Sequence, residues 1–299
     1  LPHNHGATVH ADGTHYYFTN EHENTVDVVN TRTFEVEKRI PLANGPHNLS
    51  ASMSARKVYV AIIAEPLIQV IDMDSNEIIA NIETGGGVHN TFVTPDGRYA
   101  VGGMIGASEI IAIDTETDEV KFEMSIPYSQ NPFVGGVRPL TFTVNEDGST
   151  RSMLVNVGGW HGFWEFDWET QELMNKVSPP DGSWERMDQT ADGIQSAPSH
   201  GVVVLPDQSQ VWHSSRATSH IYGYSFPDYD YLGRVYIGNP AWITTTPDSK
   251  FLWVGVSGHN ETAVVDVEKQ EVIKRFPVGQ APKRIFTAIM PSDWEGEAP

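Results

Sequence analysis

The chain has 299 residues, of which 39 % are hydrophobic and 10 % aromatic, and its formal net charge is -20 at pH 7. This acidic balance argues against nucleic-acid partners, which need clustered Lys and Arg, and against anionic membrane surfaces. No apolar run approaches the ~18 residues of a membrane span, so we expect none. The chain has no cysteine, which is compatible with an oxidising compartment. The opening residues LPHNHG contain neither Met nor an apolar signal core, and we expect a processed start.

A short signature recurs along the chain: an Asp-like residue, an acidic residue five positions later, and then an apolar residue. Successive copies are separated by 42, 42, 53, 58 and 41 residues. The copies begin at Asn30 (NTRTFEV), Asp72 (DMDSNEI), Asp114 (DTETDEV), Asp167 (DWETQEL), Ser225 (SFPDYDY) and Asp266 (DVEKQEV). The sequence therefore contains a repeat of about 42 residues with two insertions.

Each repeat divides into short apolar stretches separated by turn residues. In the second repeat they are HNLSAS (47–52), KVYVAII (57–63), LIQVIDM (67–73) and EIIANIE (77–83). Stretches of this length and alternation are typical of strands, and no convincing helix appears. Four-stranded units repeated every ~40 residues form the blades of a β-propeller. We therefore predict an all-β fold and a single propeller domain over 1–299.

Two segments do not fit a complete repeat. Residues 178–197 form a Pro- and Gly-containing insertion without a strand pattern, either a lid over one face or an ordinary surface loop. Residues 283–290 (KRIFTAIM) have the pattern of the innermost strand of a seventh blade. We expect seven blades, the last completed by strands upstream of residue 5. The alternative is six blades with the final strand packed elsewhere.

One motif resembles a known family. Residues 17–20 (YFTN) resemble the YVTN motif of the YVTN-repeat β-propellers, and KVYVA (57–61), RYAVGG (98–103) and FLWVGVSG (251–258) are looser versions. The resemblance spans nearly the whole chain. It implies seven blades and a periplasmic or secreted location, and it implies no single activity.

Aligning the repeats places four histidines in one position, seven residues before the turn that ends the first strand: His5, His47, His89 and His200. In a propeller this position opens the innermost strand, at the top of the central channel. Converging imidazoles bind transition metals, copper first among them, with zinc or iron as alternatives. The propeller domain of nitrous oxide reductase, with copper in a histidine ring, has a similar layout. Inheritance by duplication, with each ring bonded to a neighbouring strand, is the alternative explanation.

Other side chains are predicted near the same face. His22, His220 and His259 lie close to the loop between the second and third strands and are additional candidate metal ligands. Asn48 and Asn90, which each follow a slot histidine, could orient the ligands. Residues predicted to bind an anionic substrate, or to form its walls, are Arg138, Lys283, Trp242 and His161. Pairing of the cations with acids in neighbouring blades, and packing of the aromatic rings between blades, remain open alternatives.

We therefore predict an exported metal-dependent enzyme with a small-molecule substrate, an oxidoreductase first and a lyase or hydrolase second. No catalytic residue is marked out by a motif. One alternative is a non-enzymatic binding or scaffold module that holds a partner protein on its top face. Another is a subunit of a larger redox assembly.

Overall fold

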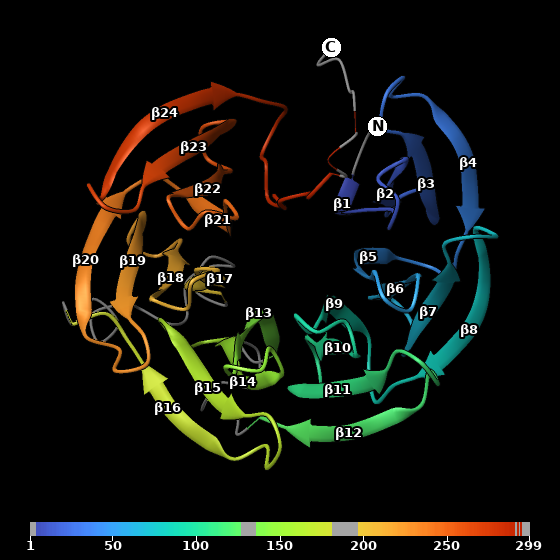
Figure 1. The fold of residues 1–299 in the computed structure, drawn as a ribbon, viewed down its shortest axis with the longest axis horizontal. Helices are drawn as coiled ribbons and strands as arrows, with labels where there is room; N and C mark the ends of the chain where they lie inside the picture. The colour runs from blue at the N-terminus through green and yellow to red at the C-terminus, as the bar shows by residue number, and fades with distance from the viewer. Residues whose placement is uncertain (1–3, 127–135, 181–196, 291, 293, 295–299) are drawn as a thin grey trace. The chain divides into compact units, whose positions relative to one another are not determined.

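The computed structural model describes residues 4–126, 136–180, 197–290, 292 and 294. In these residues the chain forms six four-stranded sheets and no helix, which confirms the all-β prediction (Figure 1). Nothing in the described part is therefore a helix that could cross a membrane. The chain divides into two compact units. The first unit comprises Leu1–Ile126 and Ala288–Pro299, and the second comprises Pro127–Thr287.

The first unit contains three sheets, β1–β4, β5–β8 and β9–β12. Their strands are β1 (Asn4–Val9), β2 (His15–Asn20), β3 (Thr25–Asn30), β4 (Val36–Pro41), β5 (Pro46–Ser52), β6 (Lys57–Ile62), β7 (Leu67–Asp72), β8 (Glu77–Glu83), β9 (Val88–Val93), β10 (Tyr99–Met104), β11 (Glu109–Asp114) and β12 (Val120–Ser125).

The second unit contains three further sheets, β13–β16, β17–β20 and β21–β24. Their strands are β13 (Val137–Val144), β14 (Thr150–Val157), β15 (Phe163–Asp167), β16 (Leu173–Val177), β17 (Ser199–Val204), β18 (Gln210–Ser215), β19 (His220–Ser225), β20 (Tyr231–Tyr236), β21 (Pro240–Thr245), β22 (Phe251–Val256), β23 (Glu261–Asp266) and β24 (Glu271–Pro277).

Every sheet is an antiparallel meander in which strand order follows chain order. Within the first unit, the leading strands β1, β5 and β9 lie side by side, and β4, β8 and β12 are outermost (Figure 1). Within the second unit, β13, β17 and β21 are the neighbouring inner strands. The sheets are the blades of a β-propeller, and the described residues contain six of them. The six-bladed alternative is the correct one.

The expectation of a seventh blade is wrong for the described residues, because 283–290 forms no strand. Pro282 and Thr287, which belong to the second unit, instead form hydrogen bonds within that unit. Thr287 Oγ1 donates to Thr245 O at 2.8 Å and lies 3.0 Å from Thr244 Oγ1, and Ser257 Oγ donates to Pro282 O at 2.8 Å. A segment with the side-chain pattern of a strand forms one only when a neighbouring strand hydrogen-bonds to its backbone. Residues 181–196 of the predicted insertion at 178–197 lie outside the described residues.

The recurring signature forms the hairpin between the third and fourth strand of each blade. Its fifth residue always has a left-handed backbone, with φ between 54° and 60° at Phe34, Asn76, Asp118, Gln171, Tyr229 and Gln270. In five of the six copies the opening Asn or Asp accepts hydrogen bonds from backbone N–H groups two or three residues later. These side-chain turns explain why Asp and Asn recur there.

The core lies between successive sheets within each unit. In the first unit Val26, Val28, Val58 and Val60 are at most 2 % exposed and pack between the first two blades. In the second, Trp212, Ile221 and Val254 are fully buried between the last two blades. Each buried apolar side chain contributes about 1.5–3 kcal/mol, so inter-blade packing fixes where the inner strands lie.

Candidate metal centre

The inner end of each blade is built by a β-bulge. In all six innermost strands the pairing with the second strand shifts register near the start. The second residue of each strand falls in this irregular stretch; these residues are His5, His47, His89, Arg138, His200 and Ala241. We call this position the inner slot. A bulge re-aims the side chain it carries, so the repeated position is set by the backbone and not by the histidines.

Three imidazoles of the inner slot gather in the first unit. The ring centroids of His5 and His47 are 3.7 Å apart, and those of His47 and His89 are 4.3 Å apart. His47 and His89 are 4 % and 6 % exposed, whereas His5 is partly accessible. The structure therefore brings together three of the four predicted histidines, with an open end at His5.

Hydrogen bonds set the chemistry of the His47 ring. His47 Nδ1 lies 2.7 Å from the backbone carbonyl of His89, to which it donates. In a neutral imidazole the other nitrogen, Nε2, then carries the lone pair. A metal-binding histidine usually donates its second N–H to a carbonyl or carboxylate in this way. His47 thus has the tautomer that a ligand needs.

Glu21, the residue after β2, completes a candidate ligand group with His5 and His47. Glu21 Oε2 accepts from His5 Nδ1 at 2.9 Å. One nitrogen or oxygen from each of the three residues lies within 4.8 Å of the other two. Two imidazoles and a carboxylate form a donor set suited to copper, zinc or iron. Among the described residues, this is the group with metal-ligand spacing.

Thr19 and Gly6 hold together the slots of His5 and His47, two of the three in the first unit. Gly6 N donates to Thr19 Oγ1 at 2.8 Å, and that hydroxyl donates to His47 O at 2.9 Å. A Cβ at Gly6 would lie 2.8 Å from Asn48 Cα, so only glycine lets the two strands approach this closely. Thr19 is the threonine of the YFTN motif. The motif thus has a direct part in placing the histidines.

The two predicted orienting asparagines differ. Asn90 Nδ2 donates to His89 Nδ1 at 2.5 Å, so this ring is oriented by its neighbour. Asn48 Nδ2 donates to Thr91 O at 3.2 Å, in the next inner strand. Asn90 therefore orients a slot histidine, and Asn48 joins two inner strands.

The inner slot of the second unit is cationic. His200 is buried, and its pKa is well below the ordinary value because of that burial and of the charges of Arg216, Arg284 and Arg138. Burial, followed by the charge of Arg216, lowers the pKa of Arg138 to about 10. Trp242, predicted as a site wall, lies against Arg284, while the predicted Lys283 is exposed.

The remaining predicted histidines are scattered. His22 and His259 are exposed. His161 is fully buried and its Nε2 lies 2.7 Å from Ser215 Oγ. His220 Nδ1 lies 2.5 Å from Thr218 O, and its ring meets Tyr236 edge to face at 5.4 Å. Their proposed roles in metal or substrate binding stay predictions.

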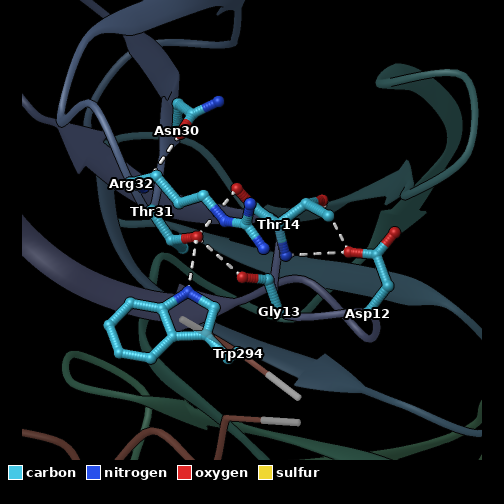
Figure 2. Close-up of a pocket in the computed structure, with 7 residues that line it drawn as sticks. All are labelled: Asp12, Gly13, Thr14, Asn30, Thr31, Arg32 and Trp294. Carbon is cyan, nitrogen blue, oxygen red and sulfur yellow. Dashed lines mark hydrogen bonds between the residues drawn. The ribbon is translucent and has the colours of Figure 1, made fainter. Parts of the chain in front are cut away.

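A hollow of about 440 Å³ lies at the far end of β1 from His5 (Figure 2). It is lined by Asp12, Gly13, Thr14, Asn30, Thr31, Arg32 and Trp294. Trp294 Nε1 donates to Thr31 Oγ1 at 3.3 Å, and that hydroxyl donates to Gly13 O at 2.8 Å. Its polar groups largely bond one another, and it holds none of the predicted site residues.

The sequence analysis did not single out Glu21, Arg216 or Arg284. Glu21 adjoins the predicted His22, and it closes the same end of the first blade because β1 and β2 are antiparallel. Arg216 directly follows β18, the same location in its own blade. Aligning the residue that follows the second strand of each blade, in the same way as the slot histidines, could have found both Glu21 and Arg216.

Comparison with known proteins supports the fold. No family model matches the sequence, and no curated protein matches it. Among solved structures, the chain is similar to Kuenenia stuttgartiensis hydrazine synthase, with a TM-score of 0.74 and 16 % identity over 97 % of this chain and 90 % of that chain. At this identity the likeness establishes a β-propeller and nothing about activity.

Proposed function

We propose that this chain is a metal-dependent propeller enzyme whose transition-metal site lies at the inner slot of the first unit. The observation that carries the proposal is the convergence of His5, His47 and Glu21 within 4.8 Å of one another. His89 stands behind His47 and supplies the carbonyl that sets its tautomer.

The donor set favours copper. Affinities of nitrogen and oxygen sites for divalent metals rise toward copper, and the absence of cysteine excludes thiolate coordination. A bound copper would supply one-electron chemistry, whereas zinc or iron used as a Lewis acid would support hydrolysis or elimination. The chain's own contribution is to hold two imidazoles and a carboxylate at the accessible edge of a buried stack.

We leave His200 out of the proposed ligand set. Three guanidinium charges act on it, and they oppose a metal cation there. Arg138 occupies an inner slot in place of a histidine, and its positive charge also opposes a metal cation there. The proposed metal site is thus confined to the first unit.

The wider identity is proposed on the sequence motifs. The YFTN stretch in β2, where Thr19 bonds the His47 backbone, supports a relation to the YVTN-repeat propellers. The absence of cysteine is consistent with a periplasmic or secreted location. The similar solved structure is named as a hydrazine synthase, so the fold occurs in an enzyme. We place oxidoreductase chemistry first because the nitrogen and oxygen donor set favours copper.

Metal analysis of the purified full-length chain tests the proposal. We expect about one equivalent of a transition metal after reconstitution, together with a ligand-field absorption band if the metal is copper. A chain that retains no stoichiometric metal, and whose folding is unchanged by chelation, would contradict it.

A second candidate function is a partner-binding module or a subunit of a larger redox assembly. Exposed apolar side chains on the outer strands of the second unit favour it; they include Tyr236 at 60 %, Ile273 at 45 % and Phe276 at 38 %. A native mass well above 33.1 kDa in the source extract, lost when Tyr236 is replaced by Ser, would support this candidate.

A further inference from the structure

Three arginines surround the inner slot of the second unit. Arg138 is in β13, Arg216 directly follows β18, and Arg284 belongs to the segment after β24. All three lie close enough to His200 for their charges to lower its pKa. We call Arg138, Arg216 and Arg284, with Trp242, the arginine cluster.

Trp242 gives the cluster a rigid wall. The guanidinium carbon of Arg284 lies 4.4 Å from the centroid of the indole ring. The His200 ring meets the same indole edge to face at 6.2 Å. Stacking on an aromatic face fixes the plane of a guanidinium group, so this wall is rigid.

Arg138 and Arg216 bring buried charge without a compensating acid. Arg138 is only 9 % exposed, and Arg216 is half-buried. In both, the Nε–H is buried and finds no hydrogen-bond partner in the described residues. The positive charge of Arg216 acts on Arg138. Among the residues that the structure describes, no carboxylate is paired with the side chain of Arg138 or Arg216. This occurs in a chain with 39 acidic residues and only 19 Lys and Arg.

Such an arrangement is unfavourable unless a negative charge completes it. Burying one guanidinium without a partner costs several kcal/mol, and like charges nearby add to that cost. In a stable fold, the two buried groups of Arg138 and Arg216 are most readily explained by a ligand that supplies their missing acceptors. Guanidinium groups match carboxylate and phosphate oxygens in bidentate geometry.

We propose that the arginine cluster is a binding site for a small oxyanion of at least two negative charges, a dicarboxylate or a phosphate. Arg138 and Arg216 supply the buried donors, and Arg284 stacked on Trp242 forms one wall of the site. His200 contributes a neutral ring to the wall. Every residue in this site belongs to the second unit, and none of them is in the proposed ligand group.

Thermal unfolding and calorimetric titration of the chelator-treated full-length protein test this proposal. Inorganic phosphate and malonate are added separately at millimolar concentration, with sodium chloride holding the ionic strength constant. The chelated protein keeps the result separate from any metal effect. We expect a concentration-dependent rise in Tm for at least one of the two anions and saturable binding. Which anion binds more tightly distinguishes a phosphate site from a dicarboxylate site.

The variant Arg216→Gln separates a binding role from a structural one. Loss of one charge-assisted contact should weaken anion binding about tenfold or more. Because the substitution also relieves repulsion with Arg138, the ligand-free Tm should stay the same or rise. Arg275→Gln is the matched control, since Arg275 is an arginine of the same unit that pairs with Glu261 at 3.1 Å.

Three results would overturn the proposal. One is the absence of any saturable response to either anion, and another is an equal response in Arg216→Gln and wild type. The third is a lower ligand-free Tm in Arg216→Gln together with unaltered binding, which would assign the arginine a purely structural role. If Arg216→Gln fails to fold, Arg138→Lys gives the same readout, because it keeps the charge and removes the bidentate fork.

Discussion

The inner slots of the two units have the same backbone and opposite electrostatics. In the first unit three histidine rings lie in a row, each tilted against the next, and a carboxylate adjoins His5; this composition attracts cations. In the second unit the equivalent positions hold Arg138, His200 and the uncharged Ala241. Two more arginines, Arg216 and Arg284, act on the His200 imidazole. The bulge at the start of each inner strand is common to both.

The difference teaches that the repeat determines location and the individual residue determines chemistry. In the first unit His47 donates to the carbonyl of His89, and His5 donates to the carboxylate of Glu21. Metal-binding histidines usually donate to such partners. The histidine in the same slot of the second unit lies among positive charges and stays neutral. The bond from His47 to a carbonyl of the neighbouring inner strand is also what the duplication alternative expects, so metal binding by this group stays a proposal.

Replacing His47, the proposed metal ligand in the middle of the histidine row, should abolish the cation site of the first unit. We expect His47→Gln to weaken copper affinity by more than about 100-fold, because even residues that only support a ligand are worth about 10- to 100-fold. Isothermal titration with Cu(II) measures the effect. His22→Gln is the control, since His22 is exposed in the same unit. Equal losses in the two variants would show that surface histidines bind the copper.

Acid should act on the buried histidines of the second unit. Burial, followed by the charge of His161, lowers the pKa of His213 from 6.5 to about 3. Between these two values the unfolded chain binds one more proton than the folded chain at this site. The free energy of unfolding should therefore fall as the pH drops below 6.5, by up to about 1.4 kcal/mol per pH unit.

The variant His213→Gln tests whether His213 causes this pH dependence of the free energy of unfolding. Its unfolding free energy should depend less steeply on pH between about 6 and 4, whatever its absolute stability. Urea titrations at several pH values measure the slope. His259→Gln should keep the wild-type slope, because His259 is exposed in the same unit. An unchanged slope in His213→Gln would contradict this assignment.

Moving β1 away from β5 should weaken both the stability of the first unit and its proposed metal site. We expect Gly6→Ala to cost about 1–3 kcal/mol, because the added methyl group meets the Asn48 backbone. Copper affinity should fall with it, since the substitution pushes β1 away from β5. Gly106→Ala is the matched control, as no atom lies within 4 Å of a Cβ there. Wild-type stability in Gly6→Ala would count against this close approach.

Removing the hydroxyl group of Thr19 should have the smallest effect on stability, and it allows a specific comparison between the two units. Thr19→Val removes the bridge between Gly6 N and His47 O and should cost about 1–2 kcal/mol. Ser214→Ala removes a similar bond in the second unit, from Ser214 Oγ to Ala241 O at 2.6 Å. Both variants should lose stability, but only Thr19→Val should weaken copper binding. A copper effect in both variants would mean that it reflects general destabilisation.

Much of this architecture could be predicted because the repeat is local. The hairpin signature depends on side-chain turns and one left-handed residue within a few positions of each other. The inner slot could be aligned because the bulge recurs at the same place in each blade. The strand pattern at 283–290 misled, because the alternation of side chains does not reveal whether a ladder partner exists.

The rest depends on contacts between segments far apart in the sequence. Glu21 turns toward His5 across a strand pair, and Arg216 and Arg284 reach His200 from different parts of the chain. Glu21 and Arg216 hold the same position in their repeats, but the sequence does not show which partners a residue at that position meets. Charge also mattered, because only the arginine cluster reveals that His200 differs from the other slot histidines.

Electron paramagnetic resonance of the Cu(II)-loaded full-length chain tests the central claim most directly. The account predicts one copper per chain with hyperfine coupling to histidine nitrogens, and loss of that signal in His47→Gln but not in Arg216→Gln. A nitrogen-coupled signal that survives His47→Gln, or that is lost in Arg216→Gln, would contradict the division of the two units into a cation site and an anion site.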